Sequence, residues 1–397
     1  MTTLKRLLFE ELIRYLEHKN ALIVTGMRQV GKTTLLKQVF TEVSKPKLWF
    51  NFDNPLDQKM FEELDYNNIY NNLLKMAETK PGERLYVFID EIQNFPEITK
   101  VIKFLIDQYQ IKFLLTGSSN FYLKNLFPES LSGRKFLFHL SPLCFKEYLY
   151  FKGQLNFTEI KSADKQTVFT SQSLWPAEKF KTAYDDYLQF GGFPEIALTE
   201  DKETKTKVLN NIFSSFFEKD LKIMADYRDI KELRDLIILL APRVGSILDI
   251  TKISSELEMP RQKLYSYLEF LQGTFFIKLL PKYSKNLDRS IAGGRKVYFS
   301  DTGMLQLVAA VNEGQILENA VVNQLDSYGE LSFYNYRNTK EIDLILNKKT
   351  ALEIKMSGSD QDLHNLKKLA GSLEIKDAYV ISKKYKEKPG FISPTLL

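Results

Sequence analysis

A run of eight residues near the amino terminus has the composition and spacing of a phosphate-binding loop. From Gly26 to Thr33 the sequence reads Gly-Met-Arg-Gln-Val-Gly-Lys-Thr, with an apolar stretch before it and a helix-forming stretch after it. The glycines permit a tight turn, backbone N–H groups and a helix amino terminus cradle phosphate, and Lys32 reaches the β and γ phosphates. Thr33 would ligate Mg²⁺. The alternative is an ordinary glycine-rich turn between a strand and a helix.

The residues expected to bind ATP through this loop are Gly26, Met27, Arg28, Gln29, Val30, Gly31, Lys32, Thr33 and Thr34.

Two adjacent carboxylates follow a second apolar run, Tyr86 to Ile89. In a parallel sheet, ligands gather at the carboxyl ends of the strands. Asp90 would therefore belong to the Mg²⁺ shell, and Glu91 would orient and polarise the attacking water, as in other phosphoryl-transfer sites. Together with the loop they predict ATP hydrolysis, whereas the alternative is a pair of solvated acids after a buried strand.

Two further positions are candidates for sensing the γ-phosphate. The next apolar run ends in Thr116-Gly117-Ser118-Ser119-Asn120, so either Ser118 or Asn120 would lie beside the same phosphates unless this is plain loop polarity. Arg134 is a candidate arginine finger or sensor, because a guanidinium offsets charge that develops on the transferred phosphoryl group. An ordinary surface arginine fits its sequence context equally well.

A second group of chemically suggestive residues lies near the carboxyl terminus. Residues 341–346 and 351–356 alternate between apolar and polar side chains around a turn-prone Asn-Lys-Lys, which predicts a β-hairpin. If Leu346 pairs with Thr350, Asp343 faces Glu353 across the strands. Opposed carboxylates destabilise a bare hairpin, but a shared divalent cation would reverse the effect.

The hairpin also supplies a lysine in the position that metal-dependent phosphodiester cleavage requires. An aspartate followed on the next strand by Glu-x-Lys is the arrangement of restriction-type nucleases, in which acids hold Mg²⁺ and lysine helps to generate hydroxide. Asp343, Glu353 and Lys355 are the predicted catalytic set, and Glu318, on a helical pattern, is the third candidate ligand for a second Mg²⁺ or Mn²⁺. The alternative is an amphipathic hairpin with a solvated, salt-bridged face.

The elements that would position the loop and its acids alternate between strand and helix patterns. This rhythm predicts an α/β fold with a parallel sheet covered on both faces, over residues 1–150. The expected strands are Ala21–Val24, Leu48–Phe52, Leu85–Ile89, Ile111–Leu115 and Phe136–Leu140.

The middle of the chain predicts a helical extension and then a winged helix-turn-helix. Residues 151–235 begin as a polar insertion and continue as a helical subdomain. Residues 236–291 hold two short helix patterns separated by Met259 and Pro260, then a strand and a basic segment that would form the wing. Eight Lys or Arg against five Asp or Glu modestly favour phosphate contact. Such modules also serve only to join domains, and Glu269 lies on the expected recognition helix.

The basic side chains of the expected wing are Lys282, Lys285, Arg289, Arg295 and Lys296.

Composition places the chain among globular proteins. Of its 397 residues 44% are apolar and 26% charged, which excludes disordered and collagen-like classes, and its one cysteine, Cys144, excludes an internal disulfide. The longest apolar stretch, Leu236–Ala241, is too short to span a bilayer, and the first residues lack the apolar run of a signal peptide. We therefore expect a cytoplasmic protein without membrane segments. A net charge of +5 is too small to name a polyanionic partner.

Taken together, several short motifs resemble those of prokaryotic AAA-type P-loop ATPases that carry a C-terminal restriction-endonuclease-like α/β domain. The resemblance spans nearly the whole chain, with a polar stretch near residues 155–173 that looks like an insertion. It implies that the family's Glu, Glu-x-Asp and Glu-x-Lys pattern falls on Glu318, on residues 341–343 and on residues 353–355. The motifs are residues 28–34, 89–93, 116–119, 131–134, 191–194 and 298–303.

Two functions follow from these observations. In the first, ATP binding and hydrolysis gate a metal-dependent nuclease formed by residues 292–397, with residues 236–291 positioning DNA or RNA. In the second, the protein is a nucleotide-controlled switch or DNA-binding regulator whose nuclease fold is not catalytic. The second is favoured by the 14 basic and 13 acidic residues of 292–397, which form no electrostatic funnel for DNA. A protein partner and a homo-oligomer are compatible with both.

Overall fold

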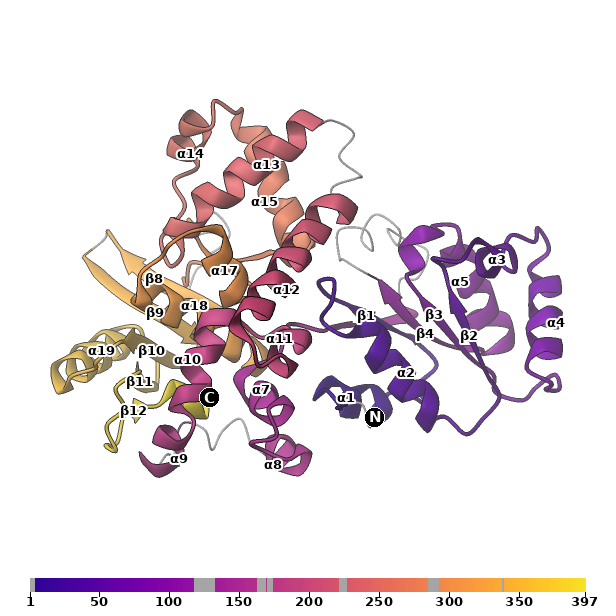
Figure 1. Cartoon of the computed structure of the whole chain (residues 1–397), viewed down its shortest axis with the longest axis horizontal. Helices are drawn as coiled ribbons and strands as arrows, with labels where there is room; N and C mark the ends of the chain where they lie inside the picture. Colours follow the sequence, from indigo (N-terminus) through magenta and orange to yellow (C-terminus); the bar gives the residue numbers. More distant parts are fainter. Residues whose placement is uncertain are drawn as a thin grey trace. The chain divides into compact units, whose positions relative to one another are not determined.

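The computed structural model of the protein describes residues 4–117, 133–162, 169, 174–220, 227–284, 293–337 and 339–397. The chain forms two compact units. The first comprises Met1–Ser141 and Gly273–Phe275, and the second comprises Pro142–Gln272 and Phe276–Leu397. Figure 1 draws the sheet of the first unit in indigo to purple and the elements of the second from magenta to yellow.

The first unit is built on a five-stranded parallel sheet with the strand order β2-β3-β4-β1-β5, as the strand and helix patterns predict. Every residue of β1, β3 and β4 is buried, because helices cover both faces of the sheet. This burial explains why these strands are continuous apolar runs rather than alternating ones. The strands are β1 (Ala21–Thr25), β2 (Lys47–Asn51), β3 (Tyr86–Asp90), β4 (Lys112–Gly117) and β5 (Lys135–His139).

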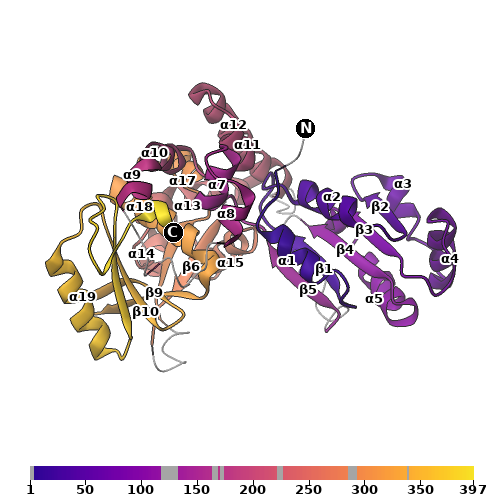
Figure 2. The same ribbon diagram turned by 90° about the horizontal axis from the view of Figure 1, so that it is seen from below.

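Helices α2 and α5 lie on opposite sides of this sheet (Figure 2). The face covered by α4 and α5 forms a continuous apolar core, in which Ile69 and Leu73 of α4 and Ile102 of α5 meet Val87 of β3 and Phe113 of β4. The helices of this unit are α1 (Leu8–Arg14), α2 (Lys32–Glu42), α3 (Pro55–Lys59), α4 (Tyr66–Met76), the 3₁₀ turn Ile92–Asn94 and α5 (Ile98–Tyr109).

The second unit starts earlier than the boundary at residue 150 that the sequence suggests. Helix α7 follows β5 directly, and its Phe145 and Tyr148 pack against Tyr184 and Tyr187 of α10. This aromatic packing draws α7 into the second unit, so the first unit ends at Ser141. The helices are α7 (Phe145–Phe151), α8 (Phe157–Ser162), α9 (Leu174–Lys179), α10 (Lys181–Phe190), α11 (Pro194–Leu198), α12 (Lys202–Ser215), the π-helical Phe216–Asp220 and α13 (Tyr227–Leu240).

Two short helices and a hairpin occupy the region where the sequence predicts a winged helix-turn-helix. Helix α14 (Ile250–Glu256) is capped by Asp249, whose side chain accepts from the N–H of Lys252. It is followed by α15 (Arg261–Gly273) and by the antiparallel strands β6 (Ile277–Pro281) and β7 (Arg295–Phe299). The 3₁₀ turn Ala241–Arg243 precedes α14. Apart from Gly273–Phe275, these residues and residues 292–397 belong to one compact unit rather than to separate ones.

The carboxyl-terminal region has the mixed α/β architecture that the sequence predicts. Its five strands have the order β12-β11-β10-β9-β8, with β8 and β10 antiparallel to β9, and β11 parallel to both β10 and β12. The predicted register of Leu346 opposite Thr350 is confirmed. The elements are α17 (Thr302–Val308), α18 (Glu313–Leu325), 3₁₀ turns Asp326–Tyr328 and Pro394–Leu396, β8 (Leu331–Tyr336), β9 (Lys340–Leu346), β10 (Thr350–Lys355), α19 (Asp360–Ser372), β11 (Asp377–Ser382) and β12 (Phe391–Ile392).

Candidate active site

The phosphate-loop sequence lies between β1 and α2, as predicted. Gly31 adopts a left-handed conformation with φ of 95° at the cap of α2, and Lys32 is the first helical residue. Met27 and Val30 are buried, so these residues can serve a phosphate only through their backbone groups. The Nζ of Lys32 donates to the carbonyl oxygens of Gly26 at 3.0 Å and Met27 at 2.8 Å. The ammonium group is therefore held within the loop, next to the amino terminus of α2.

Asp90 and Thr33 meet at the carboxyl-terminal edge of the sheet. The Oγ1 of Thr33 donates to Oδ2 of Asp90 at 2.8 Å. Asp90 is buried at the end of β3 and stands beside the loop because β3 and β1 both flank β4. A carboxylate next to a hydroxyl is an oxygen donor set that suits a small, hard divalent cation. The donors present therefore fit Mg²⁺, as the sequence suggests.

Glu91 leaves the line of β3 directly after Asp90. Its backbone is left-handed, with φ of 57°, an uncommon conformation for a residue other than glycine. Its carboxylate accepts a hydrogen bond from the side-chain amide of Gln93. Strained backbone of this kind gathers at functional sites, and here the turn separates the two adjacent acids.

Thr116 joins both acids and is missing from the predicted site. Its Oγ1 donates to Oδ1 of Asp90 and accepts from the N–H of Glu91 at 3.2 Å. The signal that could have found it is register: Ile89 pairs with Leu115 in the parallel ladder, so Asp90 and Thr116 are the next residues of their strands. Ser118 and Asn120, which the sequence favours as sensors, lie outside the described residues.

Arg6 is a second residue that sequence reasoning misses. Its guanidinium is buried and donates to the carbonyl oxygens of Val30 and Ser141, each at 2.8 Å. It therefore ties the phosphate loop to the residue that ends the first unit. No motif or spacing in the sequence points to this role, because the contact joins residues 24 positions apart.

Arg134 does not join this site in its own chain, which corrects one of the two roles expected for it. It precedes β5 at the amino-terminal edge of the sheet, opposite the loop, where its carbonyl accepts from the N–H of Ala21. Its Nε donates to Asp107 at 2.6 Å, and this bond raises the pKa of Arg134. A cavity of about 490 Å³ at this edge is lined by Lys19, Asn20, Ile106, Asp107, Gln110, Gly133 and Arg134.

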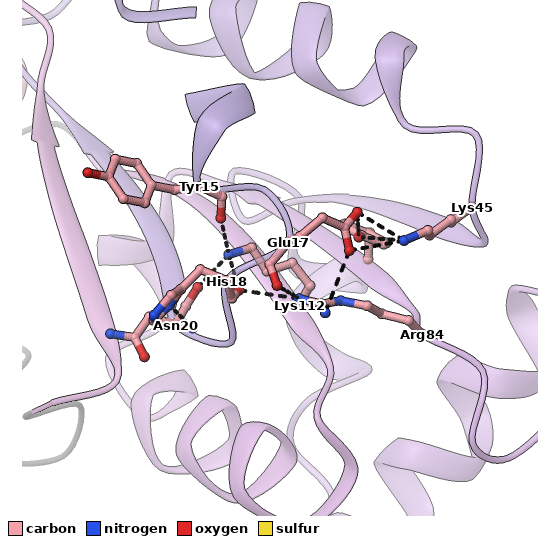
Figure 3. Close-up of polar contacts among 8 residues, drawn as sticks. Tyr15, Glu17, His18, Asn20, Lys45, Arg84 and Lys112 are labelled. Atoms are coloured by element: carbon pink, nitrogen blue, oxygen red, sulfur yellow. Dashed lines mark hydrogen bonds and ion pairs between the residues drawn. The ribbon is translucent and has the colours of Figure 1, made fainter. Parts of the chain in front are cut away.

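A buried lysine holds the segment that leads into β1 (Figure 3). The Nζ of Lys112 donates to the carbonyl oxygens of Tyr15, His18 and Asn20 at 3.1, 2.6 and 2.6 Å. Burial lowers the pKa of Lys112 to about 7. These bonds hold residues 15–20 against the start of β4, at the end of β1 opposite the phosphate loop.

A second set of contacts anchors the same segment through Glu17. Lys45 lies 2.9 Å from its carboxylate, and the hydroxyl of Tyr86 donates to it at 2.8 Å. The hydrogen bond from Lys45 is the main cause that lowers the pKa of Glu17. Arg84 donates to the carbonyl oxygens of Glu17 and His18 (Figure 3).

The carboxylates of the C-terminal hairpin lie near one another but are engaged by other groups. The Oδ2 of Asp343 accepts from the N–H of Ile354 at 2.8 Å, and Glu353 lies 2.7 Å from Nζ of Lys355. Burial raises the pKa of Glu353 to about 7, with repulsion from Asp343 as the next cause. Asp343 and Glu353 thus lie close enough to repel each other, and this repulsion helps to raise the pKa of Glu353.

Lys296 enters this acidic group, which corrects its assignment to an exposed wing. Its Nζ lies 2.7 Å from Glu341 and 3.7 Å from Glu318, and its side chain is only 3% exposed. Glu318 also accepts from the hydroxyl of Tyr298 at 2.6 Å, and burial raises the pKa of Glu318 to about 7. The wing residues Lys285 and Arg289 lie outside the described residues, and Arg295 is exposed.

Other groups of the chain engage the predicted C-terminal metal ligands Glu318, Asp343 and Glu353. Within the described ranges, no three His, Cys, Asp or Glu side chains are grouped so that they could hold a metal ion. Lys296 and Tyr298 engage Glu318, whereas a backbone N–H engages Asp343. Binding of a second Mg²⁺ or Mn²⁺ by Glu318, Asp343 and Glu353 stays a prediction.

The fold and the first site define an AAA-type P-loop ATPase. The parallel sheet, the loop after β1 and the acids after β3 are the features of this class. In agreement, an AAA domain family matches residues 18–149. Two domains of unknown function, DUF8612 and DUF4143, match residues 181–315 and 313–392.

Two uncharacterised proteins share most of the chain. The protein MJ1544 of Methanocaldococcus jannaschii is 30% identical over 335 residues, which cover 82% of this chain and 71% of that one. A protein of Haemophilus influenzae is 26% identical over 403 residues, covering 96% and 93%. The chain belongs to the family of the archaeal protein, the prokaryotic AAA-type ATPases with a C-terminal domain of unknown function.

Solved structures show more distant likeness. The Walker-type ATPase PABY2304 of Pyrococcus abyssi is 16% identical with a TM-score of 0.43, covering 76% of this chain and 94% of that one. The ORC1 protein of Aeropyrum pernix, solved in complex with DNA, is 12% identical with a TM-score of 0.33, covering 76% and 90%.

Among the helices that the structure describes, none is both long and apolar enough to cross a bilayer.

Proposed function

We propose that the protein binds and hydrolyses ATP with Mg²⁺ and that its nucleotide state controls the second unit, as in a nucleotide-driven switch. The observation that carries this proposal is the bonded group formed by Thr33, Asp90, Thr116 and Glu91 beside Lys32. Thr33, Asp90 and Thr116 come from α2, β3 and β4, Glu91 directly follows β3, and the parallel sheet brings them to one edge.

Each member of the site has a separate task in hydrolysis. Backbone N–H groups from Gly26 to Thr34 would bind the phosphates, and Lys32 would exchange its bonds to loop carbonyls for the β and γ phosphate oxygens. Thr33 and Asp90 would hold Mg²⁺, which neutralises phosphate charge when bound. Glu91 would orient water, with Gln93 and Thr116 fixing its position.

Arg134 would serve the nucleotide of a neighbouring copy in a homo-oligomer. It lies at the edge opposite its own loop, and its side chain is 36% exposed, so a second chain can reach it. Asp107 holds the guanidinium in place at 2.6 Å. An arginine supplied in trans offsets charge on the transferred phosphoryl group.

The site is tested by ATP binding and turnover of three variants. Lys32→Ala should abolish ATP binding, whereas Glu91→Gln should bind ATP and slow hydrolysis by at least about 100-fold. Glu97→Gln, an exposed acid nearby, is the matched control and should hydrolyse ATP normally. Normal turnover by Glu91→Gln would remove the proposed role of Glu91.

We propose that the switch acts on nucleic acid and that α15 makes the contact. Its exposed face presents Arg261, Gln262 and Tyr265, of which Tyr265 is 58% exposed. Lys263 is instead paired with Asp229 and Glu232 of α13 at 2.7 and 2.5 Å. DNA affinity lost in Arg261→Ala and kept in Lys263→Ala would support α15 as the contact; equal affinity in both would argue against it.

Metal-dependent nuclease activity is the second candidate. It is favoured by Lys355, which lies 2.7 Å from Glu353, and by the pairing of β9 and β10, which carry Asp343 and Glu353. The test is incubation with circular and single-stranded DNA or RNA in Mg²⁺ or Mn²⁺, with and without ATP. Cleavage lost in Glu353→Ala would establish the activity, and intact ATPase activity without cleavage would leave the switch.

A further inference from the structure

Residues 139–141, which we call the exit segment, form the last part of the first unit before the chain enters the second. Leu140 continues the pairing of β5 with β1, because its N–H donates to the carbonyl of Thr25 at 2.8 Å. Its own carbonyl packs directly on Gly26, where an added Cβ would lie 2.2 Å from the oxygen. Glycine is therefore required at the start of the phosphate loop by the exit segment as well as by the turn.

Arg6 ties the exit segment to the other end of the loop. One nitrogen of its guanidinium donates to Val30, immediately before Gly31, and another donates to Ser141. The side chain is 5% exposed, and a buried charge-assisted pair of bonds is costly to break. The two ends of the loop are thus both joined to the exit segment, one by packing and the other through Arg6.

The exit segment is also joined to a short stretch from much later in the chain. Residues Gly273–Phe275 belong to the first unit although the residues on both sides belong to the second. The ring of Phe275 packs on the ring of His139 with a centroid separation of 4.0 Å. Gly273 is the last residue of α15, so one peptide segment carries both this contact and the helix.

The backbone at Phe275 is held in a conformation that a bulky residue rarely adopts. Its φ is 61°, in the left-handed region, whereas Phe276 is 1% exposed among Phe216 and Phe299 of the second unit. Phe275 and Phe276 are adjacent in the chain, but they belong to different units. Such strain persists only where the surrounding packing determines the conformation, and it is typical of switch regions.

We infer that the exit segment and Phe275 transmit the nucleotide state of the phosphate loop to α15. The inference rests on the proposed function and adds the route by which the nucleotide site controls α15. A change of the loop alters the positions of Val30 and Gly26, these move the exit segment, and His139 passes the change to Phe275. Coupling of this kind requires an element whose arrangement both sites bias, and the exit segment contacts the loop at one end and Phe275 at the other.

The experiment compares hydrogen exchange of peptides covering α15 with and without ATP and Mg²⁺. The full chain carries Glu91→Gln to hold ATP. Ordering of the loop should slow exchange in α15 by about fivefold, the lower range of measured couplings. Phe275→Gly removes the ring and suits the positive φ, and His139→Ala removes the other ring. Leu137→Ala, on an exposed position of β5, is the matched control.

The outcomes distinguish failure of the inferred route from failure of the proposed ATP-binding function. The expected result is equal ATP affinity in all chains, with slowed exchange in the parent and in Leu137→Ala but not in Phe275→Gly or His139→Ala. A response kept by both aromatic variants, or absent from a parent that binds ATP, would overturn the route alone. Absence of ATP binding in the parent would overturn both the route and the proposed function.

Discussion

The backbone of Gly191 lies against the carboxylate of Asp301, so closely that a Cβ on this glycine would be 2.1 Å from Oδ1. The N–H of Gly192 donates to Oδ2 of the same aspartate at 2.7 Å, and the N–H of Met304 donates to Oδ1 at 3.0 Å. Burial raises the pKa of Asp301 to about 6 against these bonds. The motifs around residues 191 and 301 therefore form one structural junction between α10 and α17.

This junction predicts a large effect from a small substitution. Gly191→Ala combines a positive φ of 81° with a clash against a buried carboxylate, and we expect it to lower the free energy of unfolding by about 3 kcal/mol. Gly153→Ala has a φ of 69° but open space around its Cβ, so it should cost only about 1 kcal/mol. Thermal unfolding followed by circular dichroism measures both; equal losses would contradict the predicted clash.

Thr116→Val tests the threonine that joins the two acids. The substitution keeps the shape but removes the hydroxyl bonded to Asp90 and to the N–H of Glu91. We expect kcat for ATP hydrolysis to fall by about 10-fold to 100-fold with little change in ATP affinity. Thr25→Val is the control, because the buried hydroxyl of Thr25 has no hydrogen-bond partner in the described structure. A normal kcat in Thr116→Val would show that this bridge is dispensable.

The lowered pKa of Lys112 predicts that the stability of the first unit depends on pH. The ordinary pKa of 10.5 applies in the unfolded chain, whereas burial lowers it to about 7 in the folded protein. Between these values the unfolded chain binds more protons, so stability should rise with pH, by at most about 1.4 kcal/mol per unit. Lys112→Met should remove this rise, and Lys103→Met, at an exposed position of α5, should retain it.

The measurement is urea unfolding from pH 7 to 10 in a Trp175→Phe background, where Trp49 of the first unit is the remaining tryptophan. A pH slope that is identical in Lys112→Met and in the parent would assign the dependence to other groups.

Lys296 and Arg295 are adjacent on β7 but differ in their surroundings. Lys296→Met would leave the exposed Glu341 and the partly buried Glu318 without their ammonium partner, and we expect a loss of about 2 kcal/mol in stability. Arg295→Met changes an exposed position and should alter stability by less than about 0.5 kcal/mol. The melting temperatures of the two variants test this difference. Similar values would contradict the stabilising contacts of Lys296 and favour its predicted role as a wing residue.

The parts of the fold predicted from sequence were those governed by local pattern. The apolar runs that became β1 to β5 and the hairpin register of Leu346 with Thr350 follow from periodicity and turn chemistry over a few residues. The phosphate loop likewise places Lys32 and Thr33 by their order in one short segment. A buried parallel sheet then brings Asp90 beside Thr33 with little further freedom.

Several members of the candidate sites depended on contacts between distant segments. Thr116 meets Asp90 through the register of two strands, and Arg6 reaches Val30 through the packing of α1 against α2. Arg134 proved to lie at the opposite edge of the sheet, because a residue before β5 emerges where parallel strands begin. None of these placements leaves a local signal in the chain.

By itself the sequence determined the alternation of strands and helices, the nucleotide loop and the hairpin, since each is written in the pattern of a short segment. Only the tertiary structure decided which charges meet. Lys296 was predicted on an exposed wing, yet it is buried against Glu341, because β7 and β9 are brought together by the fold. Electrostatic partners are set by distances in space, and those distances, unlike periodicity, are properties of the folded chain.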